Sequence, residues 1–340
     1  MGPGSKKLRY GPFLYSSPGR PHQADGLQIA PAEPIVISPK PPSPVPGFLH
    51  RAILLTLLGL AGCQSGAETE TGAYGRCSRL FAGGVVPQTG AVSVVPLCEE
   101  NDTTVFFATG YGPASQHGAW SAYRLDKAQA RELFEQPRPR PALKFRQNPK
   151  LAAGGLRQPR HESYTGTGWD RGHLAPNGAL AWSVEAQRAS FTVSNIAPQS
   201  PRMNRNIWRC FETSIREWAV AYGDIHVVVG TLAGPRTIVS ERDPDRVAVS
   251  VPSHFFAVVY RPAPEPSALA VLVPNEPGHR DIRDFTMTVA GLEVGTGYRF
   301  GLPAAVATQE LDLKRWPTRV VAREYLGKLP EIDVQCPRAG

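Results

Sequence analysis

The sequence lacks the short motifs that mark several common enzyme classes. None of its five cysteines forms a C-x-x-C pair, which excludes a zinc ribbon. It has no G-x-x-x-x-G-K-[ST] phosphate loop and no G-x-S-x-G nucleophile elbow. The segment HESY at 161–164 lacks the second histidine of a zincin helix. These absences argue against a P-loop nucleotidase, an α/β-hydrolase and a zincin protease.

Long hydrophobic runs are also scarce. The apolar run 52–62 has eleven residues, whereas a helix needs about 20 to span a bilayer. It follows a short basic flank and ends in LAGC at 60–63, which resembles the lipobox of bacterial lipoproteins. We therefore predict a Pro-rich leader or mis-assigned start over 1–47 and a lipoprotein-type signal over 48–63, with lipidation of Cys63. A buried hydrophobic helix and a mitochondrial presequence are the alternatives.

Export would also explain the number of cysteines. With Cys63 set aside as an anchor, four cysteines remain, and an even number in an exported chain permits two disulfides. Proximity in sequence favours pairing Cys77 with Cys98 and Cys210 with Cys336. The expected location is the bacterial cell envelope, lipid-anchored and periplasmic or on the surface, or outside the cell. The mitochondrion is the alternative location.

Positive charge is abundant and unevenly placed. The chain has a formal net charge of +8 and a pI of about 9.4. Between 138 and 173 there are two acids, Glu162 and Asp170, and eight basic residues. The basic residues are Arg138, Arg140, Lys144, Arg146, Lys150, Arg157, Arg160 and Arg171. This pattern favours an acidic partner such as nucleic acid, an anionic membrane or an acidic polysaccharide.

From about residue 80 onward, strand-like and helix-like segments are mixed. Segments 103–111 and 120–125 predict a β-hairpin, and further strands are expected at 224–234, 251–262 and 268–275. Helices are expected at 126–136, 204–223 and 283–300, and 183–199 predicts a short helix that leads into an extended segment. Because there is no internal repeat, we expect a linker over 64–79, one domain over 80–326 and a tail over 327–340.

The stretch YTGTGWDRGHLAPNGALAW at 164–182 is the strongest candidate for a site. His173 is a candidate general base at neutral pH. Arg171 offers a planar guanidinium that can bind a phosphate, and Gly172 permits close approach of a backbone or substrate. The spacing G-x-G-x-x-x-G is one residue too long for a dinucleotide fingerprint. A polar turn with a structural histidine is the alternative interpretation.

One motif lies within this stretch, and four more follow it in a fixed order. DRGH at 170–173 continues as LAP, and SNIAPQ follows at 194–199. Asn204, Trp208, Glu212 and Arg216 fit N-x-x-x-W-x-x-x-E-x-x-x-R, and VPSHFFAVVY (251–260) and VLVPNEP (271–277) follow. Together they resemble the DNA/RNA non-specific endonuclease family, ββα-metal nucleases of the endonuclease G type. Over roughly 95–325 the resemblance implies an α+β (mixed α/β) chain with the ββα-metal (His-Me finger) nuclease fold, a central antiparallel sheet and flanking helices.

The spacing of the N-x-x-x-W-x-x-x-E-x-x-x-R motif has a physical meaning that does not depend on the resemblance. On a regular α-helix, residues four apart drift by only ~40° per step, so the four side chains would share one face. Asn204 would lie in the first turn, where its amide oxygen could reach a metal. An amphipathic helix with a solvated polar stripe is the alternative interpretation.

The resemblance implies hydrolysis of phosphodiester bonds in DNA and RNA with one Mg²⁺, for which Mn²⁺ could substitute. The products would carry 5′-phosphate ends. His173 would act as general base on the attacking water, and Asn204 would bind the metal directly. Glu212 would orient metal-bound water, while Arg171 and Arg216 would hold the phosphate charge.

The remaining site residues implied by the resemblance have supporting roles. Asp170 and Asn195 would orient the site. An upstream arginine of the family could correspond to Arg138, Arg140 or Arg146; Arg140 is favoured for this role, and Arg140 and Arg146 are expected to bind substrate.

One ambiguity concerns the metal ligand, because Asn206 lies two residues after Asn204. The spacing to Trp208 and Glu212 favours Asn204.

The partners implied are DNA and RNA, contacted through phosphates by the basic loop 138–160, because no base-reading module is found. A membrane contact through Cys63 and a homodimer are also expected. Two other functions fit the same chain. One is a catalytically silent, lipid-anchored nucleic-acid-binding protein on this fold, and the other is an envelope lipoprotein whose basic loop meets anionic lipid.

Overall fold

The computed structural model describes residues 72–89, 92–278 and 281–316, all within the second of the two units, 1–60 and 61–340, into which the chain divides. The predicted leader 1–47, the signal 48–63 with Cys63, the tail 327–340 and Cys336 lie outside the described residues. Within the described ranges, no helix is long and apolar enough to cross a bilayer.

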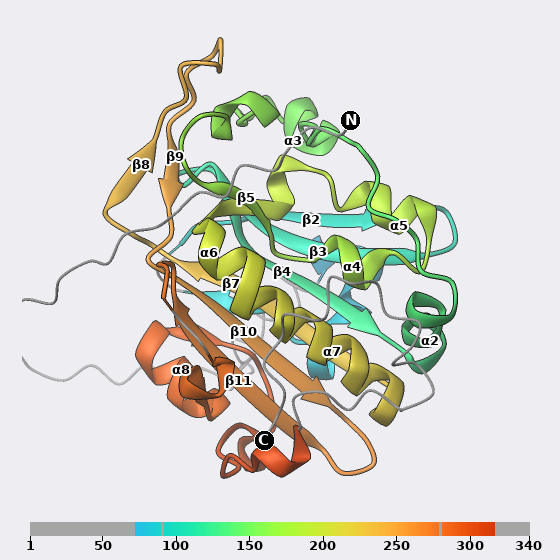
Figure 1. The fold of residues 1–340 in the computed structure, drawn as a ribbon. Coiled ribbons are helices and arrows are strands. Elements are labelled where there is room, and N and C mark those ends of the chain that lie inside the picture. Colours follow the sequence, from blue (N-terminus) through green and yellow to red (C-terminus); the bar gives the residue numbers. More distant parts are fainter. Residues whose placement is uncertain (1–71, 90–91, 279–280, 317–340) are drawn as a thin grey trace, which may run out of the picture. The chain divides into compact units, whose positions relative to one another are not determined.

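A seven-stranded antiparallel sheet forms the centre of the structure (Figure 1). Its strands lie in the order β12-β11-β10-β7-β4-β3-β2. They are β2 (Val95–Glu100), β3 (Val105–Gly112), β4 (His117–Leu125), β7 (Ile225–Leu232), β10 (His254–Arg261), β11 (Ser267–Pro274) and β12 (Thr286–Met287). The predicted hairpin and the three predicted later strands are confirmed. With helices flanking this sheet, the predicted α+β fold class is confirmed as well.

Three two-stranded pairings accompany the central sheet. They are β1 (Gln88–Thr89) with β13 (Tyr298–Arg299), β5 (Asp170–His173) with β6 (Ile196–Gln199), and β8 (Arg236–Ile238) with β9 (Val249–Val251). The helices are α2 (Lys127–Glu135), α3 (Pro149–Ala153), α4 (Asn177–Leu180), α5 (Val184–Ala189), α6 (Pro201–Met203), α7 (Arg209–Tyr222), α8 (Val289–Thr296) and α9 (Ala304–Ala307). Helices α2 and α5 confirm the expectations for 126–136 and 183–199.

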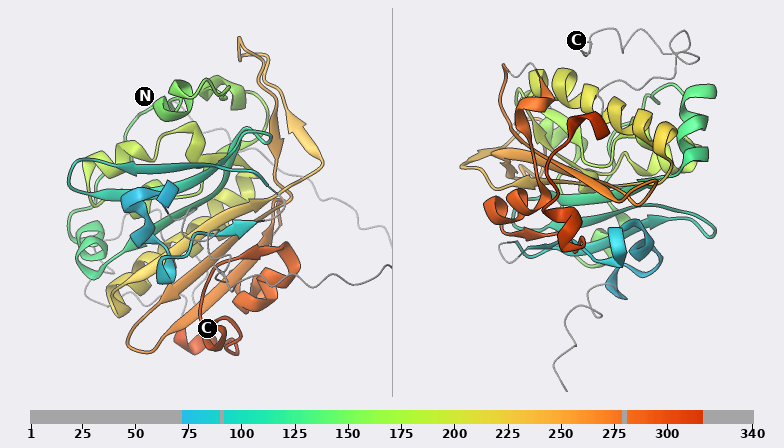
Figure 2. Two further views of the ribbon diagram at one scale, coloured as in Figure 1. Left: turned by 180° about the vertical axis from the view of Figure 1, so that it is seen from behind. Right: turned by 90° about the horizontal axis from the view of Figure 1, so that it is seen from below.

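Both faces of the sheet are covered, which is why β3 is buried along its whole length. Helices α2 and α7 lie on one face, and α8 and the segment before β1 lie on the other (Figure 2). On the α7 face, Phe211, Ile215 and Trp218 join one hydrophobic core. On the opposite face, Trp120 and Phe256 join a second core. A separate hydrophobic core therefore packs on each face of the sheet.

The second core extends further toward the N-terminus than the predicted domain boundary. Residues 64–79 are predicted as a linker, yet Tyr74 and Cys77 are buried in this core, and the segment Gly75–Leu80 forms a 3₁₀ helix. Tyr74 packs at 5.4 Å from both the Phe81 and the Trp120 rings. Aromatic packing thus includes these residues in the folded core.

Two helix predictions need correction. The helix expected over 204–223 is α7 from Arg209, and it is preceded by a π-helical turn, Asn204–Trp208. The predicted stop is confirmed, because Gly223 adopts φ 91°. The helix expected over 283–300 is confined to α8. Thr286 and Met287 before it pair with β11 as β12, and the Thr288 hydroxyl caps the helix by accepting from the Gly291 amide at 3.0 Å.

The disulfide predicted between Cys77 and Cys98 is confirmed and fastens the 3₁₀ helix to the edge strand β2. Cys210 is disulfide-bonded too, and its predicted partner Cys336 lies outside the described residues. The pairing of Cys210 with Cys336 therefore stays a prediction.

Removing the first disulfide should destabilise the fold measurably. It closes a loop with a sequence separation of 21, and a loop of that length restricts the unfolded chain by about 3 kcal/mol. We expect the double variant Cys77→Ser/Cys98→Ser to lose that much free energy of unfolding in urea denaturation. Reduction of the wild type is a poorer test, because Cys210 also takes part in a disulfide. An unchanged free energy in the double variant would contradict the prediction.

Candidate active site

Strands β5 and β6 and the helical segment after them form a compact ββα unit. The two strands pair antiparallel, with Gly172 opposite Ala197 and His173 opposite Ile196. Residue 172 must be glycine, because a Cβ there would lie 2.6 Å from the Cβ of Gln199 on the neighbouring strand. After β6 the chain turns at Ser200 directly into α6. The ββα arrangement expected from the sequence is therefore present.

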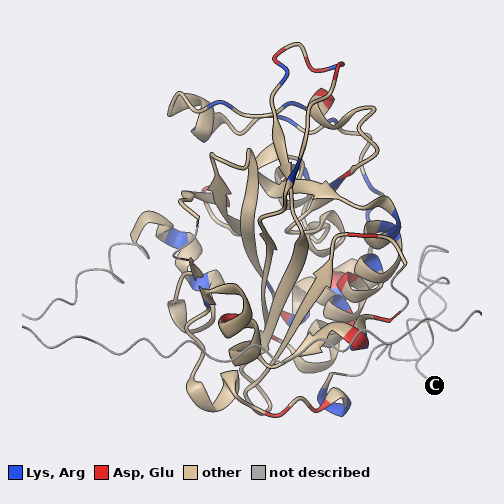
Figure 3. Cartoon of the chain, turned by 90° about the vertical axis from the view of Figure 1, so that its left-hand side faces the viewer, with Lys and Arg blue, Asp and Glu red and all other residues tan. Residues whose placement is uncertain are grey.

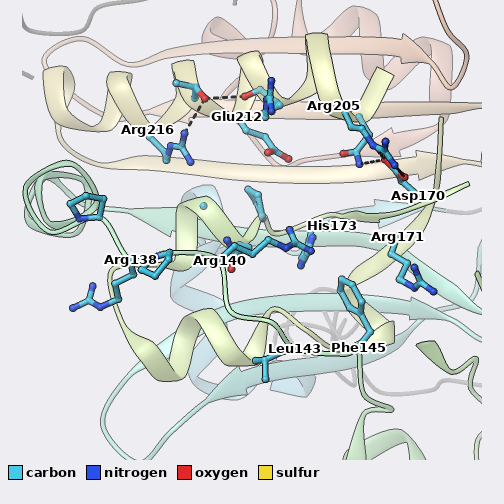
Figure 4. Close-up of a pocket in the computed structure, with 18 of the residues that line it drawn as sticks. Arg138, Arg140, Leu143, Phe145, Asp170, Arg171, His173, Arg205, Glu212 and Arg216 are labelled. Carbon is cyan, nitrogen blue, oxygen red and sulfur yellow. Dashed lines mark hydrogen bonds and ion pairs between the residues drawn. The ribbon is translucent and has the colours of Figure 1, made fainter. Parts of the chain in front are cut away.

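A pocket of about 930 Å³ opens between this unit and the loop that follows α2 (Figure 4). Six arginines and two carboxylates supply its charged groups, so it is strongly positive. The arginines are Arg138, Arg140, Arg171, Arg205, Arg209 and Arg216, and the acids are Asp170 and Glu212. His173, His161, Asn177, Asn204 and Thr213 also line it.

His173 lies at the end of β5 with its ring largely buried. Only 8% of the residue is exposed, and the rings of Phe145 and Phe191 lie 5.0 and 5.3 Å away. Its Nε2 is buried and has no hydrogen-bond partner among the residues described. Burial, reinforced by the positive charge of Arg140, lowers the pKa of His173 to about 3. The imidazole is therefore neutral near pH 7, as a proton acceptor must be.

Asp170 connects β5 to the start of the helical segment. Its carboxylate accepts a hydrogen bond from Asn204 Nδ2 at 2.9 Å. It also accepts from Arg205 Nε at 2.8 Å and Nη2 at 2.5 Å, a bidentate pair. Because Asp170 holds the amide nitrogen of Asn204, the amide oxygen is left as the group that can serve a cation in the pocket.

The start of the helix departs from the regular spacing used in the prediction. Asn204–Trp208 is a π-helical turn, whose hydrogen bonds span one residue more than those of an α-helix. Asn204, Glu212 and Arg216 all line the pocket, whereas Trp208 is buried in the α7-side core. Three of the four side chains predicted to share one face therefore line the pocket, while the Trp208 ring packs in the core. A wider first turn changes the angle between Asn204 and the residues that follow it.

Glu212 and Arg216 occupy the wall of the pocket formed by α7. Burial raises the pKa of Glu212 to about 7, although the nearby charges of Arg216 and Arg140 favour its ionised form. Arg216 donates from Nη2 to Thr213 Oγ1 at 2.9 Å. A Cβ on Gly178 would lie 2.2 Å from Arg216 Nη1, so glycine is needed there for the guanidinium to rest on α4.

Three predicted site residues lie in other surroundings. Arg171 lines the pocket, but its Nε and Nη2 donate to the His161 carbonyl at 3.0 and 2.7 Å, and its guanidinium points away from His173 (Figure 4). Asn195 is fully buried and does not line the pocket. Arg146 is exposed, also outside the pocket lining, and its backbone pairs with that of Phe191.

Most cations of the basic loop 138–160 are engaged within the chain. Arg160 forms an ion pair with Asp245 at 2.6 Å, and Lys144 forms one with Glu162 at 3.1 Å. Asp245 belongs to the loop of the β8–β9 hairpin, whose tip carries both signs of charge (Figure 3). Arg140, by contrast, lies in the pocket with its guanidinium 5.1 Å from the Phe191 ring centre. Among the three candidates for the upstream arginine, Arg138 and Arg140 reach the pocket.

Sequence reasoning missed five polar residues of the pocket: His161, Asn177, Arg205, Arg209 and Thr213. Arg205 lies between Asn204 and Trp208 and Arg209 directly follows Trp208, and their positive charge was the only available signal. Asn177 and Thr213 carried none, because their place depends on how α4 and α7 meet.

The pocket fits a cation held by few protein groups. In the described ranges, no three His, Cys, Asp or Glu side chains gather in a way that could hold a metal. The Asn204 oxygen and the Glu212 carboxylate are hard oxygen donors that line the same pocket. Such a sparse set suits a cation that keeps most of its water ligands, as Mg²⁺ does.

Comparisons with known proteins agree with this geometry. The sequence profile of the DNA/RNA non-specific endonuclease family matches residues 94–306. A mitochondrial nuclease EXOG from Danio rerio is 33% identical over 186 residues, 51% of this chain and 53% of that protein. A mitochondrial endonuclease G from Bos taurus is 33% identical over 147 residues, 40% of this chain and 49% of that protein.

A bacterial relative is matched over more of its length. A nuclease from Nostoc sp. is 30% identical over 205 residues, 57% of this chain and 70% of that protein. The chain thus spans about half the length of the two mitochondrial relatives and more of the bacterial one.

The buried His173 should make stability depend on pH. Its folded pKa of about 3 lies below the unfolded value of about 6.5, so its stabilising contribution is complete above pH 6.5 and is lost as the pH falls toward 3. Between pH 7 and pH 5 this group alone should cost about 2 kcal/mol. The free energy of unfolding of His173→Gln should therefore fall by about 2 kcal/mol less than that of the wild type between pH 7 and pH 5. Denaturant titration at the two pH values measures both changes. Parallel pH profiles of the two proteins would contradict the assignment.

Proposed function

This chain belongs to the DNA/RNA non-specific endonuclease family, and we propose that it hydrolyses phosphodiester bonds of both DNA and RNA with a divalent cation. One observation carries the proposal. A single positive pocket brings together the neutral His173, the Asn204 amide held by Asp170, and the half-buried Glu212. A base, a cation ligand and a second oxygen donor are the groups that metal-assisted hydrolysis of a phosphodiester requires.

His173 acts as the general base in this proposal. Its neutral imidazole accepts a proton from a water molecule that attacks phosphorus from the β5 side of the pocket. The aromatic rings of Phe145 and Phe191 keep the imidazole in place and exclude bulk water. Mg²⁺, or Mn²⁺ in its place, would be held by the Asn204 oxygen and would stabilise the charge on the departing 3′-oxygen. The products carry 5′-phosphate ends.

The arginines hold the phosphate. Guanidinium groups lie on two sides of the pocket. Arg216 donates to Thr213 and rests on Gly178, and Arg140 lies opposite it on the loop after α2. Arg171 braces the turn at 161–165, which leaves Nη1 as its donor for a phosphate. Because such contacts meet only phosphates, the proposal implies little discrimination between sequences and binding that weakens with salt.

Location and assembly are further parts of the proposal. The lipobox-like segment supports a lipid anchor on Cys63, which would hold the chain at a bacterial cell envelope. The mitochondrial names of two relatives support the alternative location. A homodimer rests on the family resemblance alone.

Replacing His173 tests the proposal directly. The purified chain with Mg²⁺ should degrade both plasmid DNA and RNA, and EDTA should stop the degradation. His173→Ala should be slower by about 100-fold or more, the contribution of a general base. The control His254→Ala removes a half-exposed histidine of β10 outside the pocket and should keep wild-type activity.

Two outcomes would contradict this. Equal degradation by wild type and His173→Ala would refute the role of the histidine. Binding of nucleic acid without degradation under any cation would favour the catalytically silent alternative.

Glu212 should couple cation binding to pH. With a pKa of about 7, its carboxyl is half protonated at neutral pH in the metal-free chain, and a bound cation favours the ionised form. Mg²⁺ should therefore bind about tenfold more weakly at pH 6 than at pH 8, with release of a proton. In Glu212→Gln the affinity should be weaker and independent of pH over this range. Calorimetry in buffers of different ionisation enthalpy measures both quantities, and equal pH profiles in the two proteins would refute the coupling.

A further inference from the structure

Asn177 is a pocket residue to which neither the motifs nor the proposed mechanism gives a role. It is the first residue of α4, four positions after His173. Its amide oxygen Oδ1 is buried and accepts no hydrogen bond within the part of the chain that the structure describes. A buried acceptor without a donor costs free energy, which a ligand that brings a donor would recover.

The position of Arg216 indicates which part of a substrate would meet Asn177. Its guanidinium lies against Gly178, the residue next to Asn177, and its Nη1 would be 2.2 Å from a Cβ at that position. If Arg216 holds the scissile phosphate, the sugar joined to that phosphate passes along α4. Because Asn177 lines the same pocket, a small movement of its side chain would bring the amide oxygen within reach of this sugar, close to the bond that is cut.

Few groups of a nucleic-acid backbone could donate a hydrogen bond to the Asn177 oxygen. Phosphate oxygens and ring oxygens only accept hydrogen bonds, and deoxyribose within a chain carries no hydroxyl. Ribose has the 2′-hydroxyl, which donates as well as accepts and lets a protein distinguish RNA from DNA at one site.

We propose that Asn177 accepts a hydrogen bond from a ribose 2′-hydroxyl beside the scissile phosphate, so that the pocket favours a ribonucleotide at this position. The inference rests on the proposed phosphodiester hydrolysis by the same pocket and assigns a sugar preference to it.

Arg209 provides a matched comparison in the same pocket. It is the first residue of α7, and its Nε is buried without a hydrogen-bond partner in the described ranges. The unpaired atom of Arg209 is a hydrogen-bond donor, whereas the unpaired oxygen of Asn177 is an acceptor. A donor suits a phosphate oxygen, which DNA and RNA share. Replacing Arg209 should therefore affect both sugars alike.

The test uses single-stranded DNA oligonucleotides that differ at one nucleotide, which carries a 2′-hydroxyl, a 2′-hydrogen or a 2′-fluorine. The fluorine keeps a ribose-like sugar pucker but cannot donate a hydrogen bond. The readout is kcat/KM for cleavage at the two linkages that flank this nucleotide, in the presence of Mg²⁺.

The wild type should prefer the hydroxyl over the fluorine by about tenfold, the effect of one hydrogen bond. Asn177→Ala should lose this preference because cleavage at the ribonucleotide falls by about tenfold more than cleavage of the other two substrates. Arg209→Ala should lower all three rates by a common factor and keep the preference.

Several results would overturn the inference. Equal wild-type rates on hydroxyl and fluorine substrates would do so even if Asn177→Ala failed to fold. So would an unchanged preference in Asn177→Ala, an equal fall on all three substrates, or an effect that follows the base instead of the sugar. Failure of the proposed function looks different: the wild type would cleave none of the three substrates, and both proposals would fall together.

Discussion

A single buried amide ties the pocket to the central sheet. The side chain of Asn195 accepts from Ser121 Oγ on β4 and from the Ala175 backbone nitrogen, both at 2.9 Å. It donates to the backbone oxygens of Ala175 and Ser190 at 2.9 and 3.1 Å. All of its hydrogen-bonding capacity is used, so the turn between His173 and α4 has one position relative to the sheet. The placement of the imidazole, of Gly178 and of the arginine that rests on it depends on this amide.

Burial sets two opposite properties in the same pocket. Removal from water disfavours charge on both His173 and Glu212, and it therefore lowers the pKa of the imidazole to about 3 and raises that of the carboxyl to about 7. The arginines oppose the second effect and add to the first. The imidazole is therefore held as a neutral proton acceptor, and the carboxyl remains a group that a bound cation would ionise. Low solvent access thus sets the charge states of His173 and Glu212 on which the proposed chemistry depends.

The sequence allowed the sheet, the main helix and the members of the site to be predicted wherever the determinants are local. The DRGH strand is one example, because its glycine is required by its neighbour Gln199 and its histidine follows in fixed register. Residues whose role depends on distant partners could not be placed. Arg146 and Arg140 look alike in the sequence, yet only Arg140 reaches the pocket, since the backbone at 146 is fixed against Phe191. The Asp170–Arg205 pair and the π-turn at Asn204 depend on how β5 meets the helix, which no local pattern encodes.

The bond between Cys77 and Cys98 joins the 3₁₀ helix Gly75–Leu80 to the edge of the sheet. Disulfides persist in oxidising surroundings and are reduced by the thiol systems of the cytosol. The lifetime of the folded chain is therefore coupled to the compartment in which it resides. In a reducing environment this bond would open, and the 3₁₀ helix and the core on which it packs would lose the stabilisation that the bond supplies. The pocket lies on the other face of the sheet, so loss of the bond would act on it only through the stability of the fold.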